Sequence, residues 1–114
     1  MSSNQPFAPY YGQTQAAVSA AGATVFANPV PSNARQLLLQ NVGTVLCHFK
    51  MNTAGDTSNA TAADLPILPG KSVVITKDGG NYGTADGQTR ASIFSSGAGS
   101  TVYLTPGDGF GTPA

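Results

Sequence analysis

Apolar and polar residues alternate with a period of two in much of this sequence. In residues 44–51, every second residue from Val45 to Met51 would share one face of a strand, and the residues between them would share the other face. Residues 71–76 are rich in β-branched side chains, which favour strands. No window carries a helical stripe with capping residues at both ends. The pattern therefore predicts an all-β chain.

Glycine, proline and asparagine clusters divide the chain into short strands. The residues from Asn41 to Thr44 are expected to form a turn that makes the strands on either side of it a hairpin. Leu65–Gly70 contains two prolines, so it is expected to be a short edge segment that ends in a Pro-Gly turn. The expected strands are residues 16–27, 35–42, 44–51, 71–76, 88–95 and 100–105.

Short strands separated by turns are typical of an antiparallel β-sandwich or barrel, and the sandwich is the preferred interpretation. It would be jelly-roll-like if the strand order allows. A chain of 114 residues has room for one such domain, which we place at residues 16–114. Whether Leu37 and Leu39 or Leu38 face the core is left open by the pattern. The expected core residues are Leu37, Leu39, Val45, Cys47, Phe49, Val73, Ile75, Ile93, Val102 and Leu104.

Residues 1–15 show no periodic pattern and are expected to form an extended N-terminal arm. Ordering such a polar segment costs about 1–2 kcal/mol per residue in backbone entropy, and burial of its aromatic side chains would offset this cost. The arm is therefore expected to bind a partner subunit through Phe7, Tyr10 and Tyr11. In the alternative arrangement, the arm folds back on its own sandwich and covers a sheet edge.

Charged residues are scarce and balanced in this chain. They make up 9% of it, against about 25% in an average soluble domain, and the formal net charge is zero. A surface covered by uncharged polar groups lacks like-charge repulsion and favours association. The few lysines and arginines are scattered, so direct nucleic-acid binding is not expected. Neither a signal peptide nor a membrane-spanning run of about 18 apolar residues is expected.

The sequence offers few groups for catalysis or metal binding. Cys47 and His48 are adjacent, and neighbours in a strand point to opposite faces, so Cys47 is expected in the core and His48 outside. The aspartates lie in predicted loops, where they are typical turn formers. Residues 78–87 are the best candidate for a Ca²⁺ loop, but they lack the EF-hand order and a terminal glutamate. We therefore expect no enzyme activity, no metal and no cofactor.

Three segments carry a resemblance to a known class of proteins. Residues 36–43 fit Q-L-x-x-x-N-x-G, residues 63–70 fit A-D-x-P-x-L-P-G, and residues 103–109 fit Y-x-T-P-G-x-G. In these patterns the chain resembles small virion structural proteins of tailed bacteriophages. The resemblance implies a decoration or cement protein on the capsid surface, where it would bridge major capsid protein subunits and form a homo-oligomer on the particle.

Two alternatives to capsid decoration stay open. The first is a structural role in a head fibre, the neck or the tail. The second belongs to another class, a carbohydrate-binding β-sandwich module, which would need an exposed aromatic platform with polar groups beside it. The chain has no tryptophan, and three of its aromatic residues lie in the arm. The structural role is therefore the preferred hypothesis.

Overall fold

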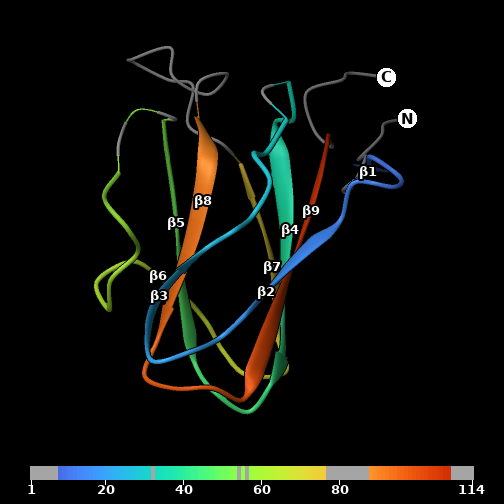
Figure 1. Ribbon diagram of the computed structural model, residues 1–114. Helices are drawn as coiled ribbons and strands as arrows, with labels where there is room; N and C mark the ends of the chain where they lie inside the picture. Colours follow the sequence, from blue (N-terminus) through green and yellow to red (C-terminus); the bar gives the residue numbers. More distant parts are fainter. Residues whose placement is uncertain (1–7, 32, 54, 56, 77–87, 109–114) are drawn as a thin grey trace.

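The computed structural model places the strands in two antiparallel sheets that pack face to face, as the alternation of apolar and polar residues predicted (Figure 1). Among the residues that it describes, no helix has the length and hydropathy needed to cross a membrane. The described residues are 8–31, 33–53, 55, 57–76 and 88–108. The strands are β1 (Ala8–Pro9), β2 (Gln15–Val18), β3 (Gly22–Val25), β4 (Gln36–Gly43), β5 (Cys47–Thr53), β6 (Leu65–Ile67), β7 (Ser72–Thr76), β8 (Gln88–Ser95) and β9 (Ser100–Asp108).

The strand order is that of a jelly roll. Sheet A has the order β1-β9-β4-β7, and β2 also pairs with β9; sheet B has the order β3-β8-β5-β6. The chain pairs β2 with β9, β3 with β8, β4 with β7 and β5 with β6, all antiparallel. Successive pairs alternate between the two sheets, so the chain is a long hairpin rolled into a sandwich. Sheet order thus confirms the jelly-roll arrangement that the sequence left open.

The expected hairpin between residues 35–42 and 44–51 is wrong. The two strands lie in opposite sheets, because β4 pairs with β7 and β9 while β5 pairs with β6 and β8. The Asn41 side-chain amide donates to the carbonyl oxygen of Val45 at 2.8 Å and thereby holds the connection as an arch between the sheets. Glycine at position 43 permits this path, because a β-carbon there would lie 2.3 Å from the carbonyl oxygen of Gly99.

The single strand expected at residues 16–27 is also wrong, because β2 joins sheet A and β3 joins sheet B. The chain changes sheets at Ser19, whose side chain is buried. Its N–H donates to the carbonyl oxygen of Ser100 at 2.8 Å, and its hydroxyl accepts from the N–H of Ser100 at 3.0 Å. These bonds satisfy the backbone at the crossing point, so the strand can break there without leaving these polar groups unpaired.

The edge segment at Leu65–Gly70 is confirmed. Among the described strands, β6 pairs only with β5, and the following turn closes with a 3.0 Å bond from the N–H of Lys71 to the carbonyl oxygen of Leu68. Pro69 and Gly70 occupy its centre, and Gly70 has a φ of 73°, as a type II turn requires.

Strand β9 runs past its expected end at Thr105 and includes Pro106. Its pairing with β2 ends at Leu104, and its pairing with β1 begins at Gly107. Pro106 therefore falls between the two partners, where no strand needs an N–H from it, and proline is tolerated in a strand at such a position.

The core lies between the sheets and contains most of the residues that the pattern assigned to it. Leu37 and Leu39 are fully buried, so Leu38 points outward. Val45 was expected in the core but is half-buried in the arch before β5. Phe26 was not predicted, and its ring packs edge-on against Phe49 with centroids 6.2 Å apart. The buried cluster is Ala17, Phe26, Val30, Leu37, Leu39, Cys47, Phe49, Ile67, Ala91, Ile93, Val102 and Leu104, with Met51, Val73 and Ile75 partly buried against it.

Candidate functional site

Of the three aromatic residues predicted to bind a partner, the structure describes two. The N–H of Tyr10 donates to the carbonyl oxygen of Pro106 at 2.9 Å, and its ring is half-buried. Tyr11 is 91% exposed in the turn that follows. Phe7 lies outside the described residues. Residues 8–15 run along β9 of the same chain, as in the alternative arrangement, and they leave Tyr11 available to a partner.

The outer face of sheet A carries apolar side chains that the sequence analysis did not single out. Tyr103 of β9 lies opposite Gln40 of β4 and Ala16 of β2, so these three side chains point to the same side. Leu38 lies opposite Val74 on that side. We call this surface the apolar face. We define it by the apolar side chains of sheet A that point away from sheet B, namely Ala16, Val18, Leu38, Val42, Val74 and Tyr103.

The apolar face is solvent-exposed and bears no charge. Four of its side chains are notably exposed for apolar residues: Val18 is 65% exposed, Val42 55%, Val74 44% and Tyr103 39%. None of the described residues that point to this side of sheet A is a lysine, arginine, aspartate or glutamate. The polar side chains that point to the same side carry amide or hydroxyl groups and are Gln36, Gln40, Ser72, Thr76, Thr101 and Thr105. An uncharged surface of this kind loses little solvation energy when another protein covers it.

A hollow of about 300 Å³ adjoins the apolar face where β4 ends and β7 begins. Gln40, Val42 and Ser72 line it from the strands, and Lys71 lines it from the preceding turn. The hollow offers amide, hydroxyl and ammonium groups beside exposed apolar ones. It can therefore receive a polar side chain of a partner or a small polar ligand.

The outer face of sheet B is partly covered by the protein itself. Residues 57–64 lie on the side of β5 and β8 that faces away from β4 and β9 (Figure 1). The N–H of Ala60 donates to the hydroxyl of Ser92 at 2.9 Å, and the guanidinium of Arg90 donates to the carbonyl oxygen of Ser58 at 2.9 Å. These bonds hold the loop down, so sheet A presents the barer of the two outer faces.

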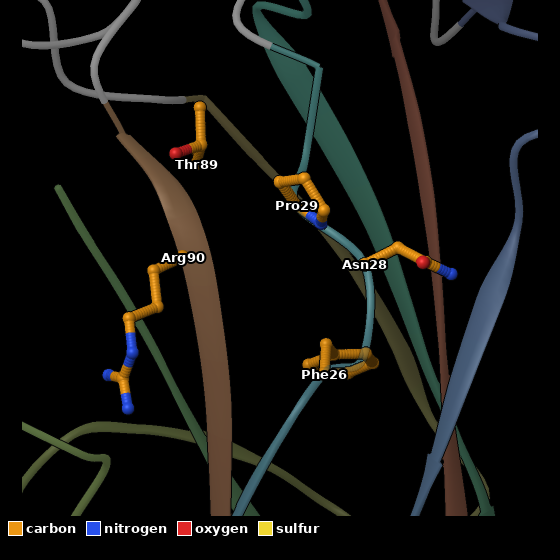
Figure 2. A pocket seen from close by; sticks show the side chains of 5 residues that line it. All are labelled: Phe26, Asn28, Pro29, Thr89 and Arg90. Atoms are coloured by element: carbon orange, nitrogen blue, oxygen red, sulfur yellow. The ribbon is translucent and has the colours of Figure 1, made fainter. Parts of the chain in front are cut away.

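Figure 2 shows a pocket of about 200 Å³ between the start of β8 and the segment that follows β3. Phe26, Asn28, Pro29, Thr89 and Arg90 line it. The amide of Asn28 points away from the pocket, and Arg90 extends toward the loop on sheet B, where it is already hydrogen-bonded. The five described lining residues contribute no carboxylate, imidazole or thiol, so they do not bring together the groups of an acid-base or nucleophilic site.

Cys47 and His48 lie on opposite sides of sheet B, as their adjacency in a strand predicted. Burial raises the pKa of the Cys47 thiol, which lies in the core. The His48 ring packs against Phe94 with centroids 6.3 Å apart, and its Nδ1 lies 3.1 Å from the carbonyl oxygen of Asp64. Within the described ranges, no three histidine, cysteine or acidic side chains cluster closely enough to hold a metal ion. The Ca²⁺ candidate at residues 78–87 lies outside those ranges.

Comparisons of the chain with protein-family models, with curated proteins and with solved structures gave no match. The functional site must therefore be inferred from the chain's own residues. The best candidate for a functional site is the apolar face of sheet A, together with the exposed Tyr11 in the turn between β1 and β2.

Proposed function

We propose that this chain is a non-enzymatic structural protein that docks on a larger protein assembly through the apolar face. The observation that carries the proposal is the outer face of sheet A, where exposed valines and Tyr103 lie on a surface without charged residues. This combination is typical of docking surfaces, because the centres of protein interfaces are depleted in charge and enriched in tyrosine.

The composition of the chain supports an assembled state. Only 9% of its residues are charged and the formal net charge is zero, so electrostatic repulsion between subunits is weak. The jelly-roll sandwich is an architecture that viral coat proteins share with lectins and cupins. Fold alone does not decide function, and the apolar face adds the site-level argument for association.

The partner that best fits these features is the major capsid protein of a tailed phage, with this chain as a decoration or cement protein on the capsid surface. The three sequence patterns at residues 36–43, 63–70 and 103–109 support this assignment through their resemblance to tailed-phage virion proteins. The apolar face would cover capsid protein, while Tyr11 would extend the contact along the turn between β1 and β2. A position in a head fibre, the neck or the tail is the rival within the same class.

Electron microscopy of virions that carry a gold label on this protein tests the proposal. Label spread over the capsid shell supports capsid decoration. Label confined to the neck, the tail or a fibre would assign the protein to that part of the virion. If purified virions do not contain the protein, the proposal is overturned. Virions prepared from a deletion strain provide the control for non-specific labelling.

A carbohydrate-binding function is the second candidate, and one feature favours it. Tyr103 lies opposite Gln40 and close to a hollow that Asn41, Lys71 and Ser72 help to line. An aromatic ring beside amide and hydroxyl groups is a common arrangement in sugar sites. A glycan array probed with the wild-type protein and with Tyr103→Ala tests this function. Glycan binding that Tyr103→Ala abolishes would favour the carbohydrate-binding function over the structural one.

A further inference from the structure

Strand β7 forms an open edge of sheet A. It pairs with β4 on one side, and no other strand among the described residues pairs with it on the other side. Its sequence, Ser-Val-Val-Ile-Thr, contains no proline, glycine or charge within the strand, and the charged residues Lys71 and Lys77 flank it in the sequence. Exposed edges usually carry such protective residues because they otherwise pair with other chains.

The backbone groups on this edge can be assigned from the hydrogen bonds of β4. The N–H of Asn41 donates to the carbonyl oxygen of Lys71 at 2.9 Å, so these opposed residues form a hydrogen-bonded pair. Pairs alternate in an antiparallel ladder, so Val73 and Ile75 also direct their N–H and C=O groups toward β4. The N–H and C=O groups of Ser72, Val74 and Thr76 therefore point to the open edge.

The side chains of β7 are symmetric about Val74. If a second copy of β7 pairs antiparallel with the first around a two-fold axis at Val74, Val73 meets Ile75 and Ser72 meets Thr76. β-branched residues then face β-branched residues, and hydroxyls face hydroxyls. The residues whose backbone groups point to the open edge become the hydrogen-bonded pairs of the new ladder, which gives about six N–H···O bonds.

The interior of the sandwich is also incompletely closed beside β7. Val73 and Ile75 point inward but are only partly buried. Leu65 of β6 lies on the same side of sheet B as the buried Phe49, yet it is 39% exposed. Apolar groups that point inward but remain exposed would gain burial if another strand covered the edge.

At the opposite edge of the sandwich, a side chain bridges the two sheets. The Gln15 amide donates to the carbonyl oxygen of Asn28 at 2.7 Å and accepts from its N–H at 3.0 Å. Nothing equivalent is present between β6 and β7 in the described residues. The two edges therefore differ, and the one at β7 is the one suited to association.

We propose that a second copy of this chain covers the edge, with β7 pairing antiparallel to β7 of the other copy around Val74 and joining two sheets A into one. The interface is isologous, as expected of a two-fold homodimer. It uses the edge of sheet A and leaves most of the apolar face free, so it is independent of what that face binds.

A charge-swap experiment on the full-length protein tests this register. In the double variant Ser72→Lys/Thr76→Lys, lysines meet across the axis at both ends of the ladder. In Ser72→Lys/Thr76→Asp, each lysine meets an aspartate. Both variants alter the same two exposed positions, so they are matched for effects on folding. Sedimentation velocity over a range of protein concentrations gives the dimer dissociation constant of each.

The wild-type protein should show a reversible monomer–dimer equilibrium, and the dilysine variant should weaken it by about tenfold or more while the lysine–aspartate variant restores it. Hydrogen exchange of the wild-type protein provides a readout without substitutions. The amides of Ser72, Val74 and Thr76 should be protected at high protein concentration and should exchange faster on dilution. A wild-type protein that stays monomeric, or two double variants that dimerise equally, would overturn the proposal.

Discussion

Replacing Asn41 with alanine tests the arch that directs β4 and β5 into different sheets. The Asn41 side chain is 1% exposed, and its amide donates to the carbonyl oxygens of Val45 and Ile67, both at 2.8 Å. Its own oxygen is buried without a hydrogen-bond partner. The Val45 carbonyl also accepts from the hydroxyl of Ser100 at 2.9 Å, so it keeps a donor in the variant. The Ile67 carbonyl loses the Asn41 amide.

The magnitude follows from these contacts. Loss of the donor to a buried carbonyl costs about 1–3 kcal/mol, and the cavity left by the side chain adds to that cost. Removal of the buried, unpartnered Asn41 oxygen offsets part of this cost. We therefore expect Asn41→Ala to lower the free energy of unfolding by about 2–3 kcal/mol. Asn41→Asp should cost more than alanine at neutral pH, because it places a carboxylate oxygen against two carbonyl oxygens.

Urea unfolding measures both variants, and Gln40→Ala is the matched control. Gln40 is the adjacent amide residue, but it is exposed on the outer side of sheet A. Its loss should change the free energy of unfolding by less than about 0.5 kcal/mol. If Asn41→Ala were as stable as Gln40→Ala, the Asn41 amide would not be what holds the arch, and the explanation for the failed hairpin prediction would be wrong.

Three further predictions concern the same fold and its proposed role. A β-carbon on Gly43 would lie 2.3 Å from the carbonyl oxygen of Gly99, so Gly43→Ala should cost about 3 kcal/mol or more in urea unfolding. Gly97→Ala, whose β-carbon would meet nothing within 4 Å, should change stability by less than about 1 kcal/mol. Because burial raises the pKa of the Cys47 thiol, the unfolded chain releases this proton first as pH rises past the ordinary thiol pKa of about 8.5. The free energy of unfolding should therefore fall with pH more steeply in the wild type than in Cys47→Ala. Heated particles that lack the protein should release their DNA, detected by dye fluorescence, at a lower temperature than complete particles, and equal release temperatures would favour a fibre or tail role.

The alternation of residues predicted where strands lie better than how they pair. Cys47 and Phe49 were expected on the core face of one strand, and both are buried there in β5. The run Leu37–Leu39 is apolar at every position, so period two could not choose its inner face. Asn41 makes that choice in the structure, because its hydrogen bonds to Val45 and Ile67 lie inside the sandwich.

Strand partners depend on contacts that are distant in sequence, which explains the failed hairpin. A turn-like sequence before Val45 is compatible with a hairpin or with an arch. In the structure the Asn41 amide holds the arch together with Ser100, whose hydroxyl bonds to both backbone groups of Val45. Phe26 and Val30 were missed for a related reason. They lie in an irregular segment after β3, where no periodic pattern marks a core residue.

The apolar face could be predicted only in part. Tyr103 lies between the core residues Val102 and Leu104, so alternation alone directs it outward. Residues 57–64 cover part of the outer face of sheet B, whereas the outer face of sheet A is bare. This difference depends on the Ala60–Ser92 hydrogen bond. A loop of small polar residues gives no sign in the sequence of which sheet it will cover.

The most direct test of the central claim is the binding of purified protein to virions that lack it, with Val18→Lys compared against Val25→Lys. Both are exposed valines near the end of a four-residue edge strand, Val18 on the apolar face and Val25 on the outer side of sheet B. A lysine on the docking surface should weaken binding by more than about tenfold, because the interface would have to bury its charge. Val25→Lys should bind like the wild type. Equal binding by the two variants would contradict a role for the apolar face in docking.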